Sequence, residues 1–201
     1  MSLDLFISLL TFAAVSSMTP GPNNTMLLTS GVNFGFSRTR PHMMGVTFGF
    51  TIMIVAVALG AGRILTAYPP LYLSLQIISI VYLLWLAWRI ASAGTSDPML
   101  NAKARPMTFF EAALFQWVNP KGWMVAISVA THYVSPETLW ADIAVLAATF
   151  FSVSLISTSS WAFFGTSLQP LLADQRKIKI FNVAMAVALV ASLLPLVREM
   201  I

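Results

Sequence analysis

The sequence predicts an all-α polytopic membrane protein with six transmembrane helices in two inverted three-helix repeats, the first helix of each repeat being broken at proline. Three observations carry this prediction: the composition, the number of apolar segments, and the place of the prolines. Of 201 residues, 58% are hydrophobic and 9% are charged, with a mean hydropathy of +0.81. Soluble domains carry roughly 25% charged residues, and disordered chains combine low hydrophobicity with high charge. Both classes are therefore excluded.

Six apolar segments are long enough to act as spans, since a transmembrane helix takes about 20 residues. They cover about residues 3–36, 43–62, 71–88, 109–133, 139–168 and 178–197. The first is interrupted by the sequence TPGPNN at residues 19–24, and the fourth by Asn119-Pro120-Lys121. Short runs with proline, glycine or charged residues separate the six segments.

Three spans precede a polar loop and three follow it. When a chain contains two successive repeats with an odd number of spans each, the repeats lie in the membrane in opposite orientations, as in inverted-repeat transporters. Pro20 and Pro120 lie 100 residues apart, close to half of the chain. We therefore expect a single integral membrane transport domain over residues 1–201, with repeat one at about 1–93, a cytoplasmic loop at about 94–106 and repeat two at about 107–201.

The basic residues predict the orientation. Eight of them fall in connections on one side of the predicted bundle: Arg38, Arg40, Arg89, Lys103, Arg105, Arg176, Lys177 and Lys179. Only Arg63 and Arg198 fall on the other side. The positive-inside rule makes the eight-residue side cytoplasmic and places both termini outside. The net charge of +4 is explained by anionic lipid, so no nucleic-acid partner is expected.

The first proline cluster predicts a functional break. Pro20, Gly21 and Pro22 cannot continue a regular helix, and backbone groups freed within a membrane need protein or a wet cavity around them. Asn23 and Asn24 follow at once and are expected to cap the resuming half-helix. The N-terminal end of that half-helix would attract a substrate carboxylate. The alternative interpretation is a kink that only shapes packing.

Lys121 lies near the middle of the fourth span, where a charge costs about 2.5–3.5 kcal/mol. We expect it to face a cavity, where it either pairs with a substrate carboxylate or holds the broken backbone. Gln116 and Asn119 lie on the same helix turns and would complete a polar site around Pro120.

The sequence gives little support for catalysis, metal binding or ATP hydrolysis. There is no cysteine and no phosphate-binding loop, and His42 and His132 stand alone at span ends. Asp4, Glu111 and Asp142 fall near membrane boundaries. No catalytic residue, metal site or cofactor is therefore predicted.

The hydroxyls of span five suit either a water path or close packing, with packing favoured. The pairs Gly31/Gly35 and Gly45/Gly49 suggest contacts between spans one and two, and such faces permit a homodimer.

Several motifs resemble the lysine-exporter (LysE/RhtB) family. They are MTPGPNN at residues 18–24, Ser30-Gly31, Gly35-Phe36, Arg38, Gly45, Gly49, YLLWLAWRIA at residues 82–91, and QWVNPK at residues 116–121. The first hundred residues are most similar to the cysteine/O-acetylserine exporter branch, followed by the homoserine/threonine branch.

The resemblance implies a gradient-driven secondary exporter of small neutral amino acids in the bacterial inner membrane, working by alternating access. Its coupling ion would be H⁺, in antiport, and its other partners membrane lipids. It also implies that Pro20, Gly21, Pro22, Asn23, Asn119, Pro120 and Lys121 belong to the transport core. The alternative function is a structural or assembly protein of the membrane without transport activity. A membrane enzyme is disfavoured, because no catalytic apparatus is visible.

Overall fold

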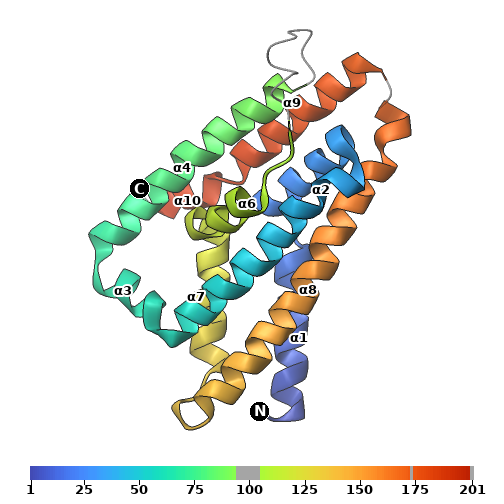
Figure 1. The fold of residues 1–201 in the computed structure, drawn as a ribbon. Helices are drawn as coiled ribbons and strands as arrows, with labels where there is room; N and C mark the ends of the chain where they lie inside the picture. Colours follow the sequence, from blue (N-terminus) through green and yellow to red (C-terminus); the bar gives the residue numbers. More distant parts are fainter. Residues whose placement is uncertain (94–104, 173, 200–201) are drawn as a thin grey trace.

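The computed structural model describes residues 1–93, 105–172 and 174–199, and every regular element within these ranges is a helix. The predicted all-α class is therefore confirmed (Figure 1). Residues 94–104 of the predicted loop lie outside the described ranges. In chain order the elements are α1 (Leu3–Met18), α2 (Pro22–Ala56), a π-helical turn (Val57–Ala61), α3 (Gly62–Ala67), α4 (Pro69–Ser92), α6 (Phe109–Phe115), a 3₁₀ turn (Gln116–Val118), α7 (Pro120–Tyr133), a 3₁₀ turn (Pro136–Thr138), α8 (Leu139–Ser167), a 3₁₀ turn (Gln169–Leu172), α9 (Gln175–Ala191) and α10 (Leu194–Glu199).

Three helical stretches of the described chain are long and apolar enough to cross a membrane: Pro22–Ala61, Pro70–Ser92 and Pro136–Ser167. The remaining helices are shorter. Helix α1, with 16 residues, reaches about 24 Å at 1.5 Å per residue, less than the ~30 Å of a bilayer core. Six spans in two inverted repeats therefore remain a prediction, whereas three long apolar helices are observed.

Both predicted breaks at proline are present. Helix α1 ends at Met18, and α2 begins at Pro22 after an extended Gly21. In the second half, α6 and its 3₁₀ turn end at Val118, and α7 begins at Pro120 after an extended Asn119. Proline suits the first helical position, where its missing N–H costs nothing. The corresponding prolines of the two breaks are thus Pro22 and Pro120, rather than Pro20 and Pro120.

The predicted capping of α2 by Asn23 and Asn24 is wrong. Both residues already lie in the first turn of α2, whose N-cap is Gly21 without a side-chain hydrogen bond. Asn24 instead turns back towards α1, and its Nδ2 donates to Ser17 O at 2.8 Å and Thr19 O at 3.0 Å. It therefore satisfies carbonyls at the end of the preceding helix.

The chain reverses direction sharply within α2. Residues 37–42, which were predicted to be a loop between spans one and two, are helical. The chain turns at Gly35, whose φ of 78° favours glycine. Ser30 and Thr39, nine residues apart, have their hydroxyl oxygens 3.1 Å from each other. In a continuous helix they would be separated by about 13.5 Å along the axis, so the two segments of α2 fold back on each other.

Glycines bring α2 close to helices of the second half, and not to a neighbouring span as predicted. A Cβ at Gly31 would overlap Ala162 O of α8, and one at Gly165 would overlap Leu28 O of α2. Gly45 and Gly49 lie against the α6 backbone at Phe109 and Ala113. Helices α2 and α8 run side by side (Figure 1).

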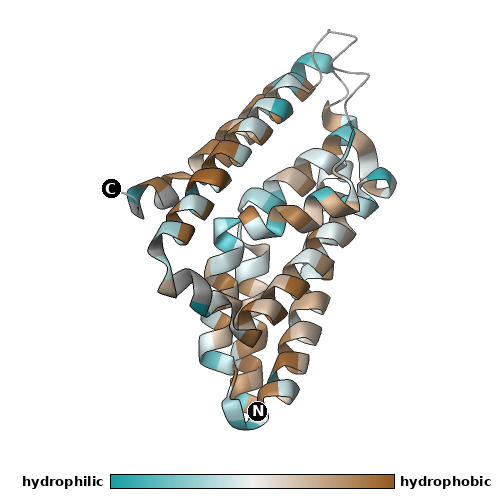
Figure 2. Ribbon diagram, turned by 60° about the vertical axis from the view of Figure 1, so that its left-hand side comes forward, coloured by the Kyte–Doolittle hydropathy of each residue, from teal (hydrophilic) through white to brown (hydrophobic). Residues whose placement is uncertain are grey.

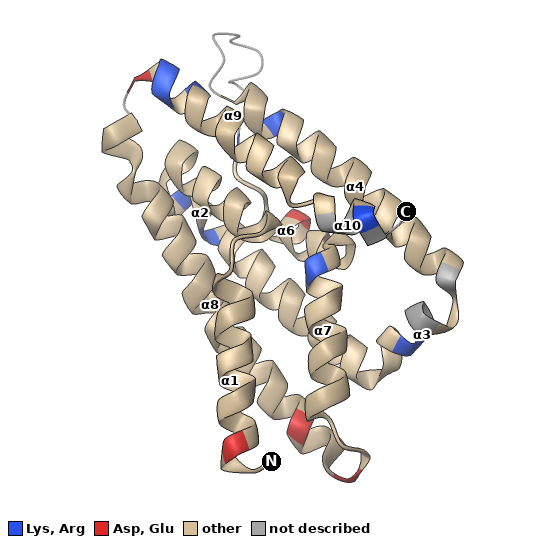
Figure 3. Cartoon of the chain, turned by 180° about the vertical axis from the view of Figure 1, so that it is seen from behind, with Lys and Arg blue, Asp and Glu red and all other residues tan. Residues whose placement is uncertain are grey.

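The surface of the bundle is apolar, as expected for contact with lipid. Val81, Ile156 and Val187 expose 59–62% of their surface, and hydrophobic residues extend along most of the outer helices (Figure 2). Basic residues gather at one end, at the start of α9, the end of α4 and on α2. Acidic residues mark the start of α1 and the connection between α7 and α8 at the other end (Figure 3). Between these ends the interior contains buried polar side chains, among them Asn24, Gln116 and Ser157.

Candidate functional site

The two breaks lie next to each other and enclose one small polar cavity, which we call the central cavity. Its volume is about 50 Å³, enough for a few water molecules. Four helices contribute to its walls: the end of α1, both segments of α2, the start of α7 and the middle of α8. The lining residues are Ser16, Ser17, Gly21, Pro22, Asn23, Asn24, Val46, Phe50, Asn119, Lys121, Gly122, Val125, Ser154, Ser157 and Thr158.

Lys121 joins the second break to the first. From the first turn of α7, its Nζ donates a hydrogen bond of 2.9 Å to Thr19 O, just beyond the end of α1. The carbonyl end of a helix carries negative partial charge and has unpaired oxygens, so an ammonium group is well placed there. Of the two roles predicted for Lys121, contact with the broken backbone is the one seen in this conformation.

The end of α1 is held by side chains from three other helices. Ser17 O accepts from Asn24 Nδ2 of α2 and from Ser157 Oγ of α8, both at 2.8 Å. Thr19 O accepts from Asn24 and from Lys121 of α7. Two of the carbonyls that the proline break deprives of helical partners, Ser17 O and Thr19 O, are thus satisfied by polar side chains around the cavity.

A pair of amides connects the breaks directly. Asn23 Nδ2 donates to Gln116 Oε1 at 2.8 Å, and Gln116 Nε2 donates to Asn23 Oδ1 at 3.1 Å. Gln116 is fully buried and also donates to Ala112 O at 2.9 Å. Since Asn23 is the residue after Pro22 and Gln116 precedes Pro120, this pair fixes one broken helix against the other.

Two buried polar atoms at the cavity have no hydrogen-bond partner among the described residues. They are Oδ1 of Asn119, a residue 2% exposed at the N-cap of α7, and Oγ of Ser17. A buried polar group without a partner is costly. Both atoms line space that can hold water or a ligand, so they are candidate contacts for a polar substrate.

Two half-helices also begin at this cavity. The first-turn amides of α2 and α7 have no intrahelical acceptors and carry positive partial charge. Close approach is possible because Gly21 has no side chain: a Cβ there would lie 3.2 Å from Lys121 Cδ and 3.3 Å from its Nζ. The cavity thus combines positive helix ends and an ammonium group with acceptor oxygens, which is the polarity that an amino-acid zwitterion requires.

The structure brings together most of the predicted site residues. Gly21, Pro22, Asn23, Asn24, Asn119 and Lys121 line the cavity. Gln116 lies behind the wall, bonded to Asn23. Pro20 and Pro120 do not line it. Pro20 is exposed, and Pro120 begins α7.

For the hydroxyls of α8 the sequence analysis favoured close packing over a polar lining, and the structure places three of them at the cavity. Ser154, Ser157 and Thr158 line the cavity and are buried, whereas Ser152 and Ser160 are exposed. Positions 154, 157 and 158 follow the i, i+3, i+4 spacing of a single helix face. That spacing, rather than the number of hydroxyls in the span, was the available signal for a polar lining.

Comparison with known proteins places the chain in a family. Residues 14–198 match the family model described as "LysE type translocator". The chain is 30% identical over 128 residues to the cysteine/O-acetylserine efflux proteins of Escherichia coli (strain K12) and Salmonella typhimurium (strain LT2). The aligned segment covers 64% of this chain and 65% of each relative, just under two thirds of their length. No solved structure matches the chain at a significant level.

The family model covers all of the central cavity's lining residues and both proline breaks. The resemblance noted from the motifs is thereby confirmed, and the family groups the chain with transporters rather than enzymes. The chain belongs to the LysE type translocator family.

Proposed function

We propose that this chain is a secondary active exporter of small neutral amino acids or their derivatives, of the cysteine/O-acetylserine or homoserine/threonine type. The named activity of the relatives in Escherichia coli and Salmonella typhimurium supports the cysteine/O-acetylserine type. The observation that carries the proposal is the central cavity, where two broken helices present opposite polarities to one shared space.

In this proposal the substrate carboxylate binds at the starts of α2 and α7, with Lys121 as its nearest cation. The substrate ammonium is accepted by Asn119 Oδ1 and by hydroxyl oxygens such as that of Ser17, which lack partners among the described residues. An amino acid is larger than the observed cavity of about 50 Å³. Binding therefore requires the half-helices to move apart, as alternating access demands.

The movement would take place between the two halves of the chain. Each half begins with a helix broken before a proline, continues with a long helix and closes with another helix. In this correspondence α2 matches α7 and α8, and α4 matches α9. The corresponding partners pack together, α2 on α8 and α4 on α9. This arrangement supports an inverted repeat whose halves rock about the central cavity.

We further propose that the protein lies in the bacterial inner membrane with its basic end in the cytoplasm. The clustering of Lys and Arg at the ends of α4 and α9 supports that orientation. An ion gradient, most simply of H⁺ in antiport, would drive export. Assembly as a homodimer is compatible with the apolar outer surface.

The test is efflux of radiolabelled O-acetylserine from proteoliposomes containing the purified chain, with an imposed pH gradient and an uncoupler control. Wild-type protein is expected to accelerate efflux, and the uncoupler to abolish the acceleration. Lys121→Ala is expected to lower the rate by about 10- to 100-fold, the effect of losing a charged hydrogen bond. Lys179→Ala, which removes an exposed lysine of α9, is the matched control and should leave the rate unchanged.

Flux that is independent of any gradient would refute secondary active transport. Absence of flux for every amino acid tested, from a folded and correctly inserted protein, would favour a structural or assembly role. Normal flux through Lys121→Ala would remove Lys121 from the mechanism.

A further inference from the structure

A second polar pocket lies nearer the basic end of the molecule and shares no lining residue with the central cavity. Its polar wall consists of Thr29, Ser30, His42, Arg89 and Arg105, and we call it the Arg89 pocket. Its volume is about 90 Å³. The remaining lining residues are apolar and come mainly from α2 and α4.

His42 is the first sign that this pocket binds a ligand. The sequence placed it at a span end, yet it is only 1% exposed, and neither ring nitrogen has a hydrogen-bond partner among the described residues. A neutral imidazole has one N–H donor and one acceptor nitrogen. Burying both without partners destabilises the fold, so His42 offers a donor and an acceptor to whatever enters the pocket.

The two hydroxyls of the pocket act as acceptors. Thr29 Oγ1 donates its hydrogen to Thr25 O at 2.8 Å. Thr39 Oγ1 donates to Gly35 O at 2.8 Å, and since a hydroxyl has one hydrogen, Ser30 must be the donor in its 3.1 Å contact with Thr39. The hydrogens of Thr29 and Ser30 are therefore used within α2, and their oxygens remain able to accept from a ligand.

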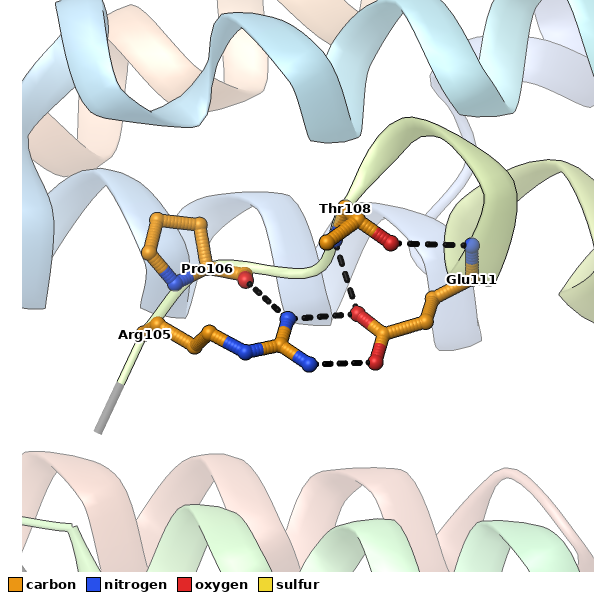
Figure 4. A network of polar contacts seen from close by, with 4 residues as sticks. All are labelled: Arg105, Pro106, Thr108 and Glu111. Atoms are coloured by element: carbon orange, nitrogen blue, oxygen red, sulfur yellow. Dashed lines mark hydrogen bonds and ion pairs between the residues drawn. The ribbon is translucent and has the colours of Figure 1, made fainter. Parts of the chain in front are cut away.

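The pocket also holds one cation whose charge is not neutralised by a described residue. Arg105 forms a bidentate ion pair with Glu111 at 2.6 and 2.7 Å and donates to Pro106 O (Figure 4). The hydrogen bonds to the Glu111 carboxylate, together with its negative charge, raise the pKa of Arg105, which stays protonated. Arg89 has no ion-pair partner in the described ranges, and its guanidinium lies 4.9 Å from the Trp85 ring centre. Its donors suit a carboxylate.

We infer that the Arg89 pocket is a second binding site for α-amino-acid zwitterions. Arg89 binds the carboxylate, and the oxygens of Thr29 and Ser30 accept from the ammonium group, with His42 contributing to either. The inference rests on the proposed export function and extends it, because the pocket would capture substrate at the basic end before it reaches the central cavity.

The chain contains no cysteine, which permits a direct binding assay that does not depend on transport. Ala93 lines the pocket, and in purified Ala93→Cys protein the rate of reaction with a small thiol reagent reports its occupancy. O-Acetylserine is expected to slow this reaction in a saturable manner. Acetate, which lacks the ammonium, and ethylamine, which lacks the carboxylate, should each protect at least about 10-fold less well.

Second substitutions in the Ala93→Cys background locate the bound ligand. Arg89→Gln is expected to raise the half-protecting concentration about 10-fold or more, and Thr29→Val and His42→Phe about 3- to 10-fold. Thr51→Val is the matched control, since Thr51 also donates to a carbonyl four residues back in α2 but lines neither pocket. Unchanged elution in gel filtration and an unchanged labelling rate without ligand show that each variant is folded.

Equal protection by acetate or chloride would overturn the inference in favour of a simple anion site. Loss of protection in Lys121→Gln, a central-cavity variant, but not in Arg89→Gln would overturn it by assigning the ligand to the central cavity. Protection without flux in proteoliposomes would refute the export function and leave this site standing. Flux without protection would refute this site alone.

Discussion

Replacing Gln116 by leucine should weaken the connection between the two broken helices by an amount that the structure allows us to estimate. Gln116 and Asn23 exchange two hydrogen bonds, at 2.8 and 3.1 Å, in a fully buried position. Hydrogen bonds between membrane helices contribute about 0.6 kcal/mol on average and at most about 1.7. The pair should therefore have a coupling energy of about 1–3 kcal/mol.

A double-mutant cycle with Gln116→Leu and Asn23→Leu measures this coupling without the other effects of each substitution. The bond from Gln116 to Ala112 O is lost in both arms of the cycle and cancels. The assay is reversible unfolding in mixed micelles of increasing denaturing-detergent fraction, followed by circular dichroism. Each single variant should be less stable than wild type, and the double variant should be more stable than additivity predicts.

Gln169→Leu provides the matched control, because Gln169 also donates an amide hydrogen bond to α2, at Val32 O, at 3.0 Å. Combined with Asn23→Leu it should be additive to within about 0.5 kcal/mol. A coupling below about 0.5 kcal/mol between Gln116 and Asn23 would refute the conclusion that this pair fixes the two breaks together.

Three further substitutions test contacts between helices, one at the first break and two elsewhere in the bundle. Gly21→Ala places a Cβ 3.2 Å from Lys121 Cδ. It should lower O-acetylserine efflux about 3- to 10-fold while changing the unfolding free energy by less than about 1 kcal/mol. Unchanged efflux would show that the close approach of Lys121 to Gly21 is not needed for transport. Gly165→Ala would overlap Leu28 O and should destabilise the protein by about 1–3 kcal/mol in the detergent titration, an effect that retained stability would contradict. Asn182→Leu removes the hydrogen bonds of the Asn182 amide to Ala93 O and to Asn33 of α2. It should lower the unfolding free energy by about 1–3 kcal/mol in the same detergent titration, and an unchanged unfolding free energy would mean that this buried amide does not stabilise the fold.

Proline and composition made the breaks predictable from sequence. Composition alone identifies an apolar helical chain, because few charged residues can be tolerated in lipid. Prolines at positions 22 and 120 make local interruptions that no tertiary contact can repair, so both breaks appear where the sequence places them. Lys121 was likewise predictable as a cavity residue, since a charge at that depth needs a polar environment.

The relations between helices were not predictable in the same way. Gly31 and Gly35 cannot be distinguished from the sequence alone. In the structure the chain reverses direction at Gly35, whereas the backbone of α8 packs directly against Gly31. Which of these a glycine does depends on what packs against it. For the same reason the direction of Asn24 was missed, because its partners Ser17 O and Thr19 O become available only after α1 and α2 are placed.

The pairing of buried amides was also hidden from sequence. Asn23 with Gln116 and Asn33 with Asn182 are separated by 93 and 149 residues. No local pattern marks a side chain as one member of a distant pair. In α8, by contrast, the spacing of Ser154, Ser157 and Thr158 did contain a readable signal, namely one polar face within an apolar helix.

Thiol accessibility on α8 in proteoliposomes tests most directly whether the broken helices enclose a hydrated site within the membrane. Ser154 lines the central cavity and is 4% exposed, whereas Ile156, two residues away, is 59% exposed on the outer surface. We expect Ser154→Cys to react with a small water-soluble thiol reagent and O-acetylserine to slow the reaction, while Ile156→Cys stays unreactive in lipid. Reaction at Ile156→Cys with none at Ser154→Cys would contradict this expectation.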